Sequence, residues 1–170
     1  MLWGTHAGIP VCGALIAENL SLRHGRGYVF LPWTMVAAGV FGILPDIFNP
    51  HITLEERHLS WSHSVWFLLA LAPMSAITVS FFPAGDLPRW RTAVLCWLAA
   101  FLHVAMDAIS GGVAWLYPWR PDVIGEYYIP PAQWLYWDAG FILLTYVLVR
   151  LRPLSLAKGM QRGEEDSDPS

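Results

Sequence analysis

The sequence predicts an all-α fold, a polytopic membrane bundle of about five helices. Hydrophobic residues make up 55% of the 170 residues and charged residues only 14%, whereas a typical soluble domain carries roughly 25% charged residues. The mean hydropathy is +0.43. The chain also has 10 tryptophans, a residue that favours the membrane–water interface. Together these observations argue against intrinsic disorder and against an ordinary soluble enzyme.

The charge limits the expected partners, and the cysteines limit the kind of metal site that is expected. The formal net charge is −3 and no long basic stretch is present, so we expect the lipid bilayer as a partner and do not expect nucleic acid. Cys12 and Cys96 each lie singly in an apolar run, and the chain has no Cys-x-x-Cys pair. We therefore expect two buried free thiols and no thiolate zinc site of that kind.

Five segments carry few or no charged side chains and are the candidate spans, because a bilayer core of about 30 Å needs about 20 apolar residues in a helix. They lie near residues 5–21, 28–44, 63–82, 92–114 and 134–151. The first contains Pro10 and Gly13, and if it is only half-buried the bundle has four spans. The membrane-embedded helical domain is expected to cover residues 1–152, and the polar segment 153–170 is predicted to be a disordered tail.

Residues near the segment ends predict how the helices begin and end. Pro45 is expected to end the second helix. Ser62 either caps the third helix or orients the imidazole of His63, and capping is the favoured interpretation. Gly111 and Gly112 are expected to loosen the end of the fourth helix and to allow a close backbone approach.

The distribution of basic residues predicts the orientation in an inner or plasma membrane. Eight of the 10 lysines and arginines lie after the first, third and fifth segments, and only Arg57 and Arg120 lie in the other loops. The positive-inside rule then places the C-terminus in the cytoplasm and the N-terminus outside. Either outer arginine could hold a substrate phosphate, although contact with lipid headgroups is the favoured interpretation.

His103 and Asp107 form the most informative ionisable pair. They are four residues apart, so they share one face of the fourth helix. Such a pair is costly inside an apolar helix unless a mutual hydrogen bond or a shared metal ion compensates it, and the pair alone leaves both interpretations open. His24 and His51 lie in polar loops and are expected to be solvated.

The predicted topology brings seven potential ligands to the outer layer, although it was obtained from lysines and arginines alone. They are His6, Asp46, His58, His63, His103, Asp107 and Asp138. Their imidazoles and carboxylates suit one or two divalent ions, with zinc favoured over manganese or iron. We expect the first six to bind the metal and Asp138 to orient a ligand or to act as a general base, on position alone.

The order of these motifs resembles that of the YdjM-like family, LexA-binding, inner-membrane-associated proteins described as predicted membrane-bound metal-dependent hydrolases. The matching pieces, over roughly residues 1–120, are Thr5-His6, Ile43-Leu44-Pro45-Asp46-Ile47, Arg57-His58, Ser62-His63-Ser64, Phe101-Leu102-His103 through Asp107, Ser110-Gly111-Gly112-Val113 and Leu116-Tyr117-Pro118-Trp119. Phe48 stands where the family often has an acid, which argues against a full second metal site. In addition, Arg57 precedes its histidine instead of following it, and Ser110 replaces a threonine.

The family is remotely similar to zinc-dependent phospholipase C and the zinc single-strand nucleases, which bind zinc with His and Asp clusters for phosphoester cleavage. The resemblance therefore implies hydrolysis of a phosphoester, with a phospholipid as a candidate substrate, through metal-activated water. A metal-ion or proton transporter that uses the same residues is one alternative. A non-catalytic metal-binding protein, or one whose polar residues only pair with each other, is another. Clustering of the ligands at one face weighs against a transport path.

Overall fold

The computed structural model of the chain describes residues 3–49, 56, 58–83, 85 and 87–167. Over these residues it contains the long helices α1 (Trp3–Arg23), α2 (Pro32–Phe48), α4 (Val65–Ser80), α5 (Arg89–Ile109) and α6 (Trp134–Ser167), and the short 3₁₀ helices η1 (Trp61–His63) and η2 (Pro131–Gln133). No strand forms in this part of the chain beyond two isolated bridges. The predicted all-α class is confirmed, and the first predicted segment is helical throughout.

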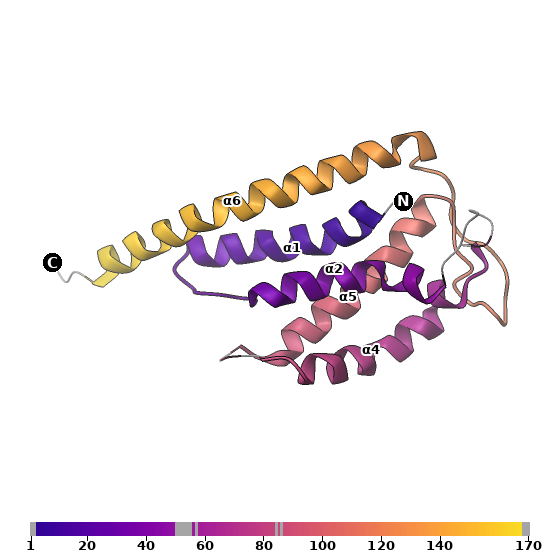
Figure 1. Ribbon diagram of the computed structural model, residues 1–170, viewed down its shortest axis with the longest axis horizontal. Helices are drawn as coiled ribbons and strands as arrows, with labels where there is room; N and C mark the ends of the chain where they lie inside the picture. Colours follow the sequence, from indigo (N-terminus) through magenta and orange to yellow (C-terminus); the bar gives the residue numbers. More distant parts are fainter. Residues whose placement is uncertain (1–2, 50–55, 57, 84, 86, 168–170) are drawn as a thin grey trace.

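The helices pack as an elongated bundle (Figure 1). α1 lies along α6 and also packs against α2, while α5 packs against both α2 and α4. The larger hydrophobic core lies among α2, α4 and α5 and includes Phe41, Leu71 and Val104. A smaller core, with Cys12 and Leu148, joins α1 to α6. Both cysteines of the chain are free and buried, as predicted.

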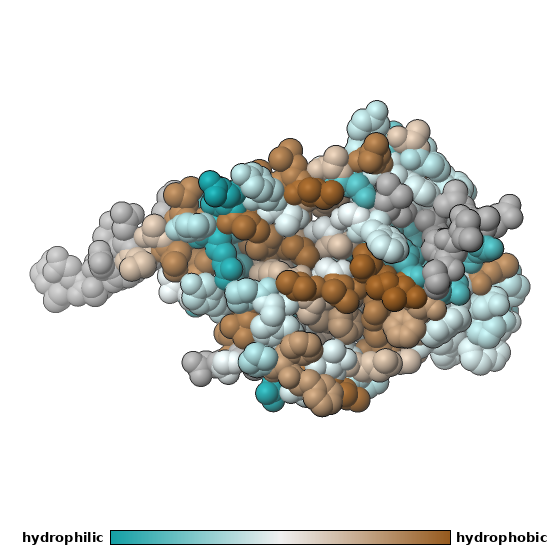
Figure 2. Space-filling model, viewed as in Figure 1, coloured by the Kyte–Doolittle hydropathy of each residue, from teal (hydrophilic) through white to brown (hydrophobic). Residues whose placement is uncertain are grey.

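Two stretches are long and apolar enough to cross a membrane: α5, and residues Pro131–Ala157 of η2 and α6. The apolar helices α2 and α4 have 17 and 16 residues, which at 1.5 Å per residue gives about 24–26 Å, less than a bilayer core of about 30 Å. α6 exposes large hydrophobic side chains such as Leu135, Ile142 and Leu143. Figure 2 shows hydrophobic residues over the middle of the bundle on the visible face. A surface of this kind is favourable against lipid and supports a membrane protein.

Two of the predicted helix ends are wrong for local reasons. α2 continues through Pro45 to Phe48. A proline this near the end of a helix removes few hydrogen bonds, and the N–H of Asn49 still donates to the Pro45 carbonyl. α4 is capped by Ser64, whose hydroxyl accepts a backbone N–H of the first turn. The favoured prediction, a cap at Ser62, is therefore wrong.

α5 ends at Ile109, five residues earlier than the sequence suggested. Gly112 then adopts φ +95°, and a Cβ at this position would lie 2.7 Å from Val123 Cγ1. The close approach of two loop segments therefore requires glycine here, in agreement with the predicted role of the glycine pair. The loop folds back on itself through an isolated bridge between Val113 and Ile124.

α6 extends far beyond the predicted boundary at residue 151 and reaches Ser167. The described part of the segment predicted as a disordered tail is therefore helical. Residues after Pro153 include leucine, alanine, methionine and glutamine, which favour helix. Ser155 is buried and its hydroxyl donates to the Leu151 carbonyl.

The two ends of the bundle differ in chemistry (Figure 1). Arg23 ends α1 and Arg89 begins α5, so these basic residues lie at the same end. In this half, Arg152 Nη2 lies 2.9 Å from Oε1 of the buried Glu18. At the opposite end α1, α4 and α6 begin and α2 and α5 finish. All seven potential ligands belong to helix ends or loops of this second end.

Candidate metal centre

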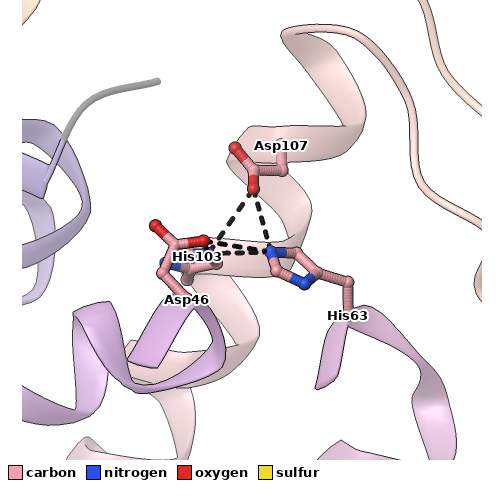
Figure 3. A group of neighbouring side chains, drawn as sticks. All are labelled: Asp46, His63, His103 and Asp107. Atoms are coloured by element: carbon pink, nitrogen blue, oxygen red, sulfur yellow. Dashed lines mark hydrogen bonds and ion pairs between the residues drawn. The ribbon is translucent and has the colours of Figure 1, made fainter. Parts of the chain in front are cut away.

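Two histidines and two aspartates converge at the end of the bundle where α2 and α5 finish (Figure 3). Asp46 comes from the last turn of α2, His63 from η1, and His103 and Asp107 lie one turn apart on α5. One ligand atom from each side chain lies within 4.8 Å of the other three ligand atoms. Because three separate elements supply them, only the folded chain brings these four side chains together.

Five of the six distances among the four ligand atoms are similar. His63 Nε2 lies 3.1 Å from His103 Nε2, 3.5 Å from Asp46 Oδ1 and 3.2 Å from Asp107 Oδ2. His103 Nε2 lies 3.3 Å from the same oxygen of Asp46 and 3.4 Å from the same oxygen of Asp107. Ligands about 2.0–2.1 Å from a tetrahedral ion are separated by about 3.3–3.4 Å, so these distances match such an ion.

A backbone carbonyl fixes the orientation of the His103 ring. His103 Nδ1 lies 2.7 Å from the carbonyl oxygen of Gly42. Because a carbonyl oxygen only accepts hydrogen bonds, Nδ1 carries the proton and donates it. In the neutral ring, Nε2 then presents its lone pair to the other three ligand atoms, which is the tautomer that a metal ligand needs.

A relay of hydroxyl groups orients the His63 ring. The hydroxyl of Ser62 donates its only proton to the Pro45 carbonyl, at 2.7 Å. It therefore accepts from His63 Nδ1, at 3.2 Å, and from the hydroxyl of Ser60, at 2.9 Å. Ser60 in turn accepts from Asn49 Nδ2 at 2.8 Å. The proton of the His63 ring is thus on Nδ1, and the lone pair of Nε2 faces the other ligand atoms.

The charges of this group fit a divalent ion. Two nitrogen lone pairs and two carboxylate oxygens repel one another unless a positive charge lies among them. A proton bridges only two of the four atoms, whereas a divalent ion contacts all four and balances both carboxylates. His63, His103 and Asp107 are fully buried and Asp46 is 8% exposed, so water does little to offset this repulsion. The residues present therefore could hold a metal ion.

His6 is in contact with this group without being one of its four members. Its ring stacks on that of His103 with the centroids 3.9 Å apart. His6 Nε2 lies 3.2 Å from Asp107 Oδ1, whereas the contacts of Asp107 with His63 and His103 are made by Oδ2. His58 also lies outside the group, and its carbonyl accepts the N–H of Ala114. The structure thus brings together four of the six predicted ligands.

Asp138 lies at the start of α6 and contacts the beginning of α1. Its Oδ2 accepts the N–H of Gly4 at 3.0 Å. Its Oδ1 accepts the N–H of Thr5 at 2.9 Å, and also the Thr5 hydroxyl. The first N–H groups of a helix have no partners within it and attract a negative charge, so Asp138 caps α1 from another helix. A role as general base stays a prediction.

The remaining predicted residues lie away from the four ligands or outside the described residues. His24 is exposed, as expected, and its Nδ1 lies 2.8 Å from the carbonyl of Leu20. Arg120 is exposed in the loop that follows α5. His51 and Arg57 are outside the described residues.

Sequence reasoning missed one residue that supports the group. Gly42 supplies the carbonyl for His103, and a Cβ at Gly42 would lie 2.4 Å from the carbonyl oxygen of His6. The signal in the sequence is its position four residues before Asp46, which places a glycine on the same helix face as a candidate ligand. A glycine there indicates that another backbone approaches closely.

Comparison with known proteins places the chain in a family. No curated protein and no solved structure matches the chain. A family model described as YdjM inner membrane protein matches residues 1–164. The match extends well beyond the roughly 120 residues that carry the resemblance in the sequence, and the two stretches long and apolar enough to cross a membrane agree with the description. The chain belongs to the YdjM inner membrane protein family.

Proposed function

We propose that this protein is a membrane-embedded, metal-dependent hydrolase that acts on a phosphoester. The observation that carries the proposal is the convergence of two imidazole nitrogens and two carboxylate oxygens, five of whose mutual distances are 3.1–3.5 Å. Structural pairing alone does not require two imidazoles to turn their lone pairs toward each other. This donor set is typical of metal sites that activate water.

We propose zinc as the ion, with manganese and iron as alternatives, and a single ion per chain. The spacing of the ligands fits the short bonds and tetrahedral geometry of zinc. Within the described residues, Asp46, His63, His103 and Asp107 form one group of potential ligands. Phe48, which takes the place of an acid, packs edge-on against Trp61 and Phe67. An apolar contact at that position supports one ion over two.

The side chains suggest how the site would work. A bound divalent ion lowers the pKa of water toward neutrality and draws charge from a phosphoryl oxygen. Asp46 is the most exposed of the four ligands, so water and substrate would approach on its side. Gly42 and Ser62 hold the two imidazoles with Nε2 directed inward. Such fixed donors avoid reorganisation during the reaction.

We further propose that the site lies at the outer membrane surface and that its substrate is a phospholipid. The basic residues of the first and third loops lie at the opposite end of the bundle, which the positive-inside rule assigns to the cytoplasm. Around the site end, Trp119, Tyr128 and Tyr136 are largely exposed. Aromatic side chains at this level are typical of the lipid headgroup region, where a phospholipid presents its phosphoester.

Hydrolysis by purified protein tests the proposed function. Chelator-stripped protein in detergent is reloaded with zinc, manganese or iron and given bis(p-nitrophenyl) phosphate or phosphatidylcholine in mixed micelles. We expect metal-dependent hydrolysis that Asp107→Asn lowers by at least about 100-fold and that His24→Gln, at an exposed histidine, leaves unchanged. Bound metal without hydrolysis of either phosphoester would contradict the hydrolase, and metal uptake by proteoliposomes would then favour a transporter.

The sidedness has a separate test. Both native cysteines are buried, so Arg120→Cys places one reactive thiol in the exposed loop after α5. In sealed right-side-out vesicles we expect a membrane-impermeant maleimide to label this variant. Labelling only after the vesicles are opened would place the site on the cytoplasmic side.

A further inference from the structure

The two oxygens of the Asp107 carboxylate have different partners. Oδ2 lies 3.2 Å from His63 Nε2 and 3.4 Å from His103 Nε2, so it faces the proposed ion. Oδ1 lies 3.2 Å from His6 Nε2. The orientation of the Asp107 carboxylate therefore depends on the contact between His6 Nε2 and Oδ1.

The chemistry of the pair makes His6 a donor. An ionised carboxylate only accepts hydrogen bonds, so the favourable arrangement places the proton of His6 on Nε2, toward Oδ1. In the neutral ring Nδ1 is then an acceptor. Both ring nitrogens are buried, and neither makes a hydrogen bond of good geometry with the described residues, so Nε2 and Oδ1 form a close polar contact at 3.2 Å. His6 itself is only 1% exposed, and its ring is held by the stack on His103.

The position of His6 depends in turn on Asp138. Both oxygens of this carboxylate accept from residues 4 and 5, directly before His6. The contact is tight, because a Cβ at Gly4 would lie 2.7 Å from Asp138 Oδ2. Asp138 is 9% exposed, so little water competes with these hydrogen bonds. α6 thus fixes the end of α1 that carries His6.

We infer that Asp138 and His6 are positioning residues that act in series, with Asp138 holding the start of α1 and His6 holding Oδ1 of Asp107, and that neither binds the ion. The inference rests on the ion of the proposed function, and it does not depend on the reaction. It gives His6 a role other than that of a metal ligand, and it gives Asp138 a positioning role in place of a general base.

The test is a double-mutant cycle on zinc affinity, measured by competition with a chelator on the full-length protein in detergent. His6→Ala and Asp138→Ala are each expected to bind about one zinc at saturation, with affinity lowered by about 10- to 100-fold. Because Asp138 acts through His6, the double variant is expected to bind no more weakly than His6→Ala. His6→Gln, which keeps an N–H donor, is expected to recover part of the loss.

A control at the same helix interface separates positioning from general stability. Cys12 Sγ lies 3.2 Å from the hydroxyl of Thr145, so Thr145→Ala removes a contact between α1 and α6 further along both helices. We expect it to leave zinc affinity within about twofold of the wild type, as is usual for sites without shared partners. X-ray absorption of the zinc-loaded wild type and of His6→Ala is expected to show two imidazole ligands in both proteins.

Four results would overturn the inference. Loss of bound zinc at saturation in His6→Ala, or a fall in the imidazole count, would make His6 a ligand. Additive losses in the double variant would mean that Asp138 does not act through His6. An equal loss of zinc affinity in Thr145→Ala would mean that the packing of α1 against α6, and not positioning by His6, causes the losses. Unchanged zinc affinity in all variants would mean that neither His6 nor Asp138 positions Asp107. Zinc binding without hydrolysis would contradict the proposed function alone.

Discussion

Replacement of Gly42 by alanine tests whether the approach of α1 to α2 builds the metal centre. A Cβ at this position would lie 2.4 Å from the carbonyl oxygen of His6 and 3.2 Å from Pro10 Cγ. The first contact is to backbone, so no side-chain rotation relieves it. The two helices must separate by about 0.6 Å to bring this contact to the 3.0 Å that real Cβ atoms respect. Overpacking of this kind costs about 1–3 kcal/mol.

The same shift acts on the ligands, because His103 depends on the Gly42 carbonyl and Asp107 contacts His6. If the strain falls on the metal-bound form, 1–3 kcal/mol corresponds to a loss of zinc affinity of about 5- to 150-fold. We therefore expect Gly42→Ala to lower both the thermal midpoint in detergent and the zinc affinity.

Gly13→Ala is the matched control, because a Cβ at Gly13 of α1 meets nothing within 4 Å. Alanine is the better helix former by about 0.5–1 kcal/mol, so this variant is expected to be at least as stable as the wild type and to bind zinc equally well. The reasoning is refuted if Gly42→Ala matches Gly13→Ala in both thermal midpoint and zinc affinity.

Three substitutions and one chemical treatment test separate parts of the structure. Ser62→Ala removes the acceptor of the His63 ring and is expected to weaken zinc binding by about 10- to 100-fold in chelator competition. Ser64→Ala removes a helix cap and is expected to cost about 1 kcal/mol of stability in thermal unfolding, with zinc affinity unchanged. The reverse pattern would contradict both assignments. Glu18→Ala leaves Arg152 and two backbone N–H groups without their carboxylate and is expected to cost about 3 kcal/mol. Zinc bound at saturation is expected to stay the same, because Glu18 lies about 18 Å along α1 from His6, which contacts the ligand Asp107. The two cysteines are buried and are expected to react with a membrane-permeant maleimide only when the protein unfolds. Mass spectrometry monitors the modification, and fast modification of the folded protein would show that a thiol is accessible.

The composition and the charge-free segments were enough to predict the helical membrane class, because lipid exposure requires long apolar stretches. Helix ends were less predictable. Pro45 suggested an end, but α2 continues to Phe48, because a proline this near the end of a helix removes few hydrogen bonds. Pro153 similarly lies within α6. Propensity is a weak guide to helix ends, because the structural context routinely overrides it.

The metal centre was predictable as a set of residues and less so as a geometry. The spacing of His103 and Asp107 placed both on one face of a helix, and the topology placed Asp46 and His63 at the same end. Which histidines face the proposed ion and which lies behind Asp107 was not predictable, because this depends on which oxygen of Asp107 faces which imidazole. The polar contacts of Gly42 likewise arise from a backbone carbonyl, which the sequence does not mark as functional.

Elemental analysis of the purified protein tests the central claim most directly. Wild type, His103→Ala and Asp107→Ala are incubated with zinc, manganese and iron, and unbound metal is removed; His24→Ala serves as the control at an exposed histidine. Circular dichroism and gel filtration check that each variant is folded. If Asp107→Ala is not, Asp107→Asn takes its place as the more conservative substitution. We expect about one equivalent of a divalent metal in the wild type and the control, and loss of that metal in the ligand variants. Wild-type protein without metal, or folded ligand variants that keep it, would show that these four side chains do not form a metal site.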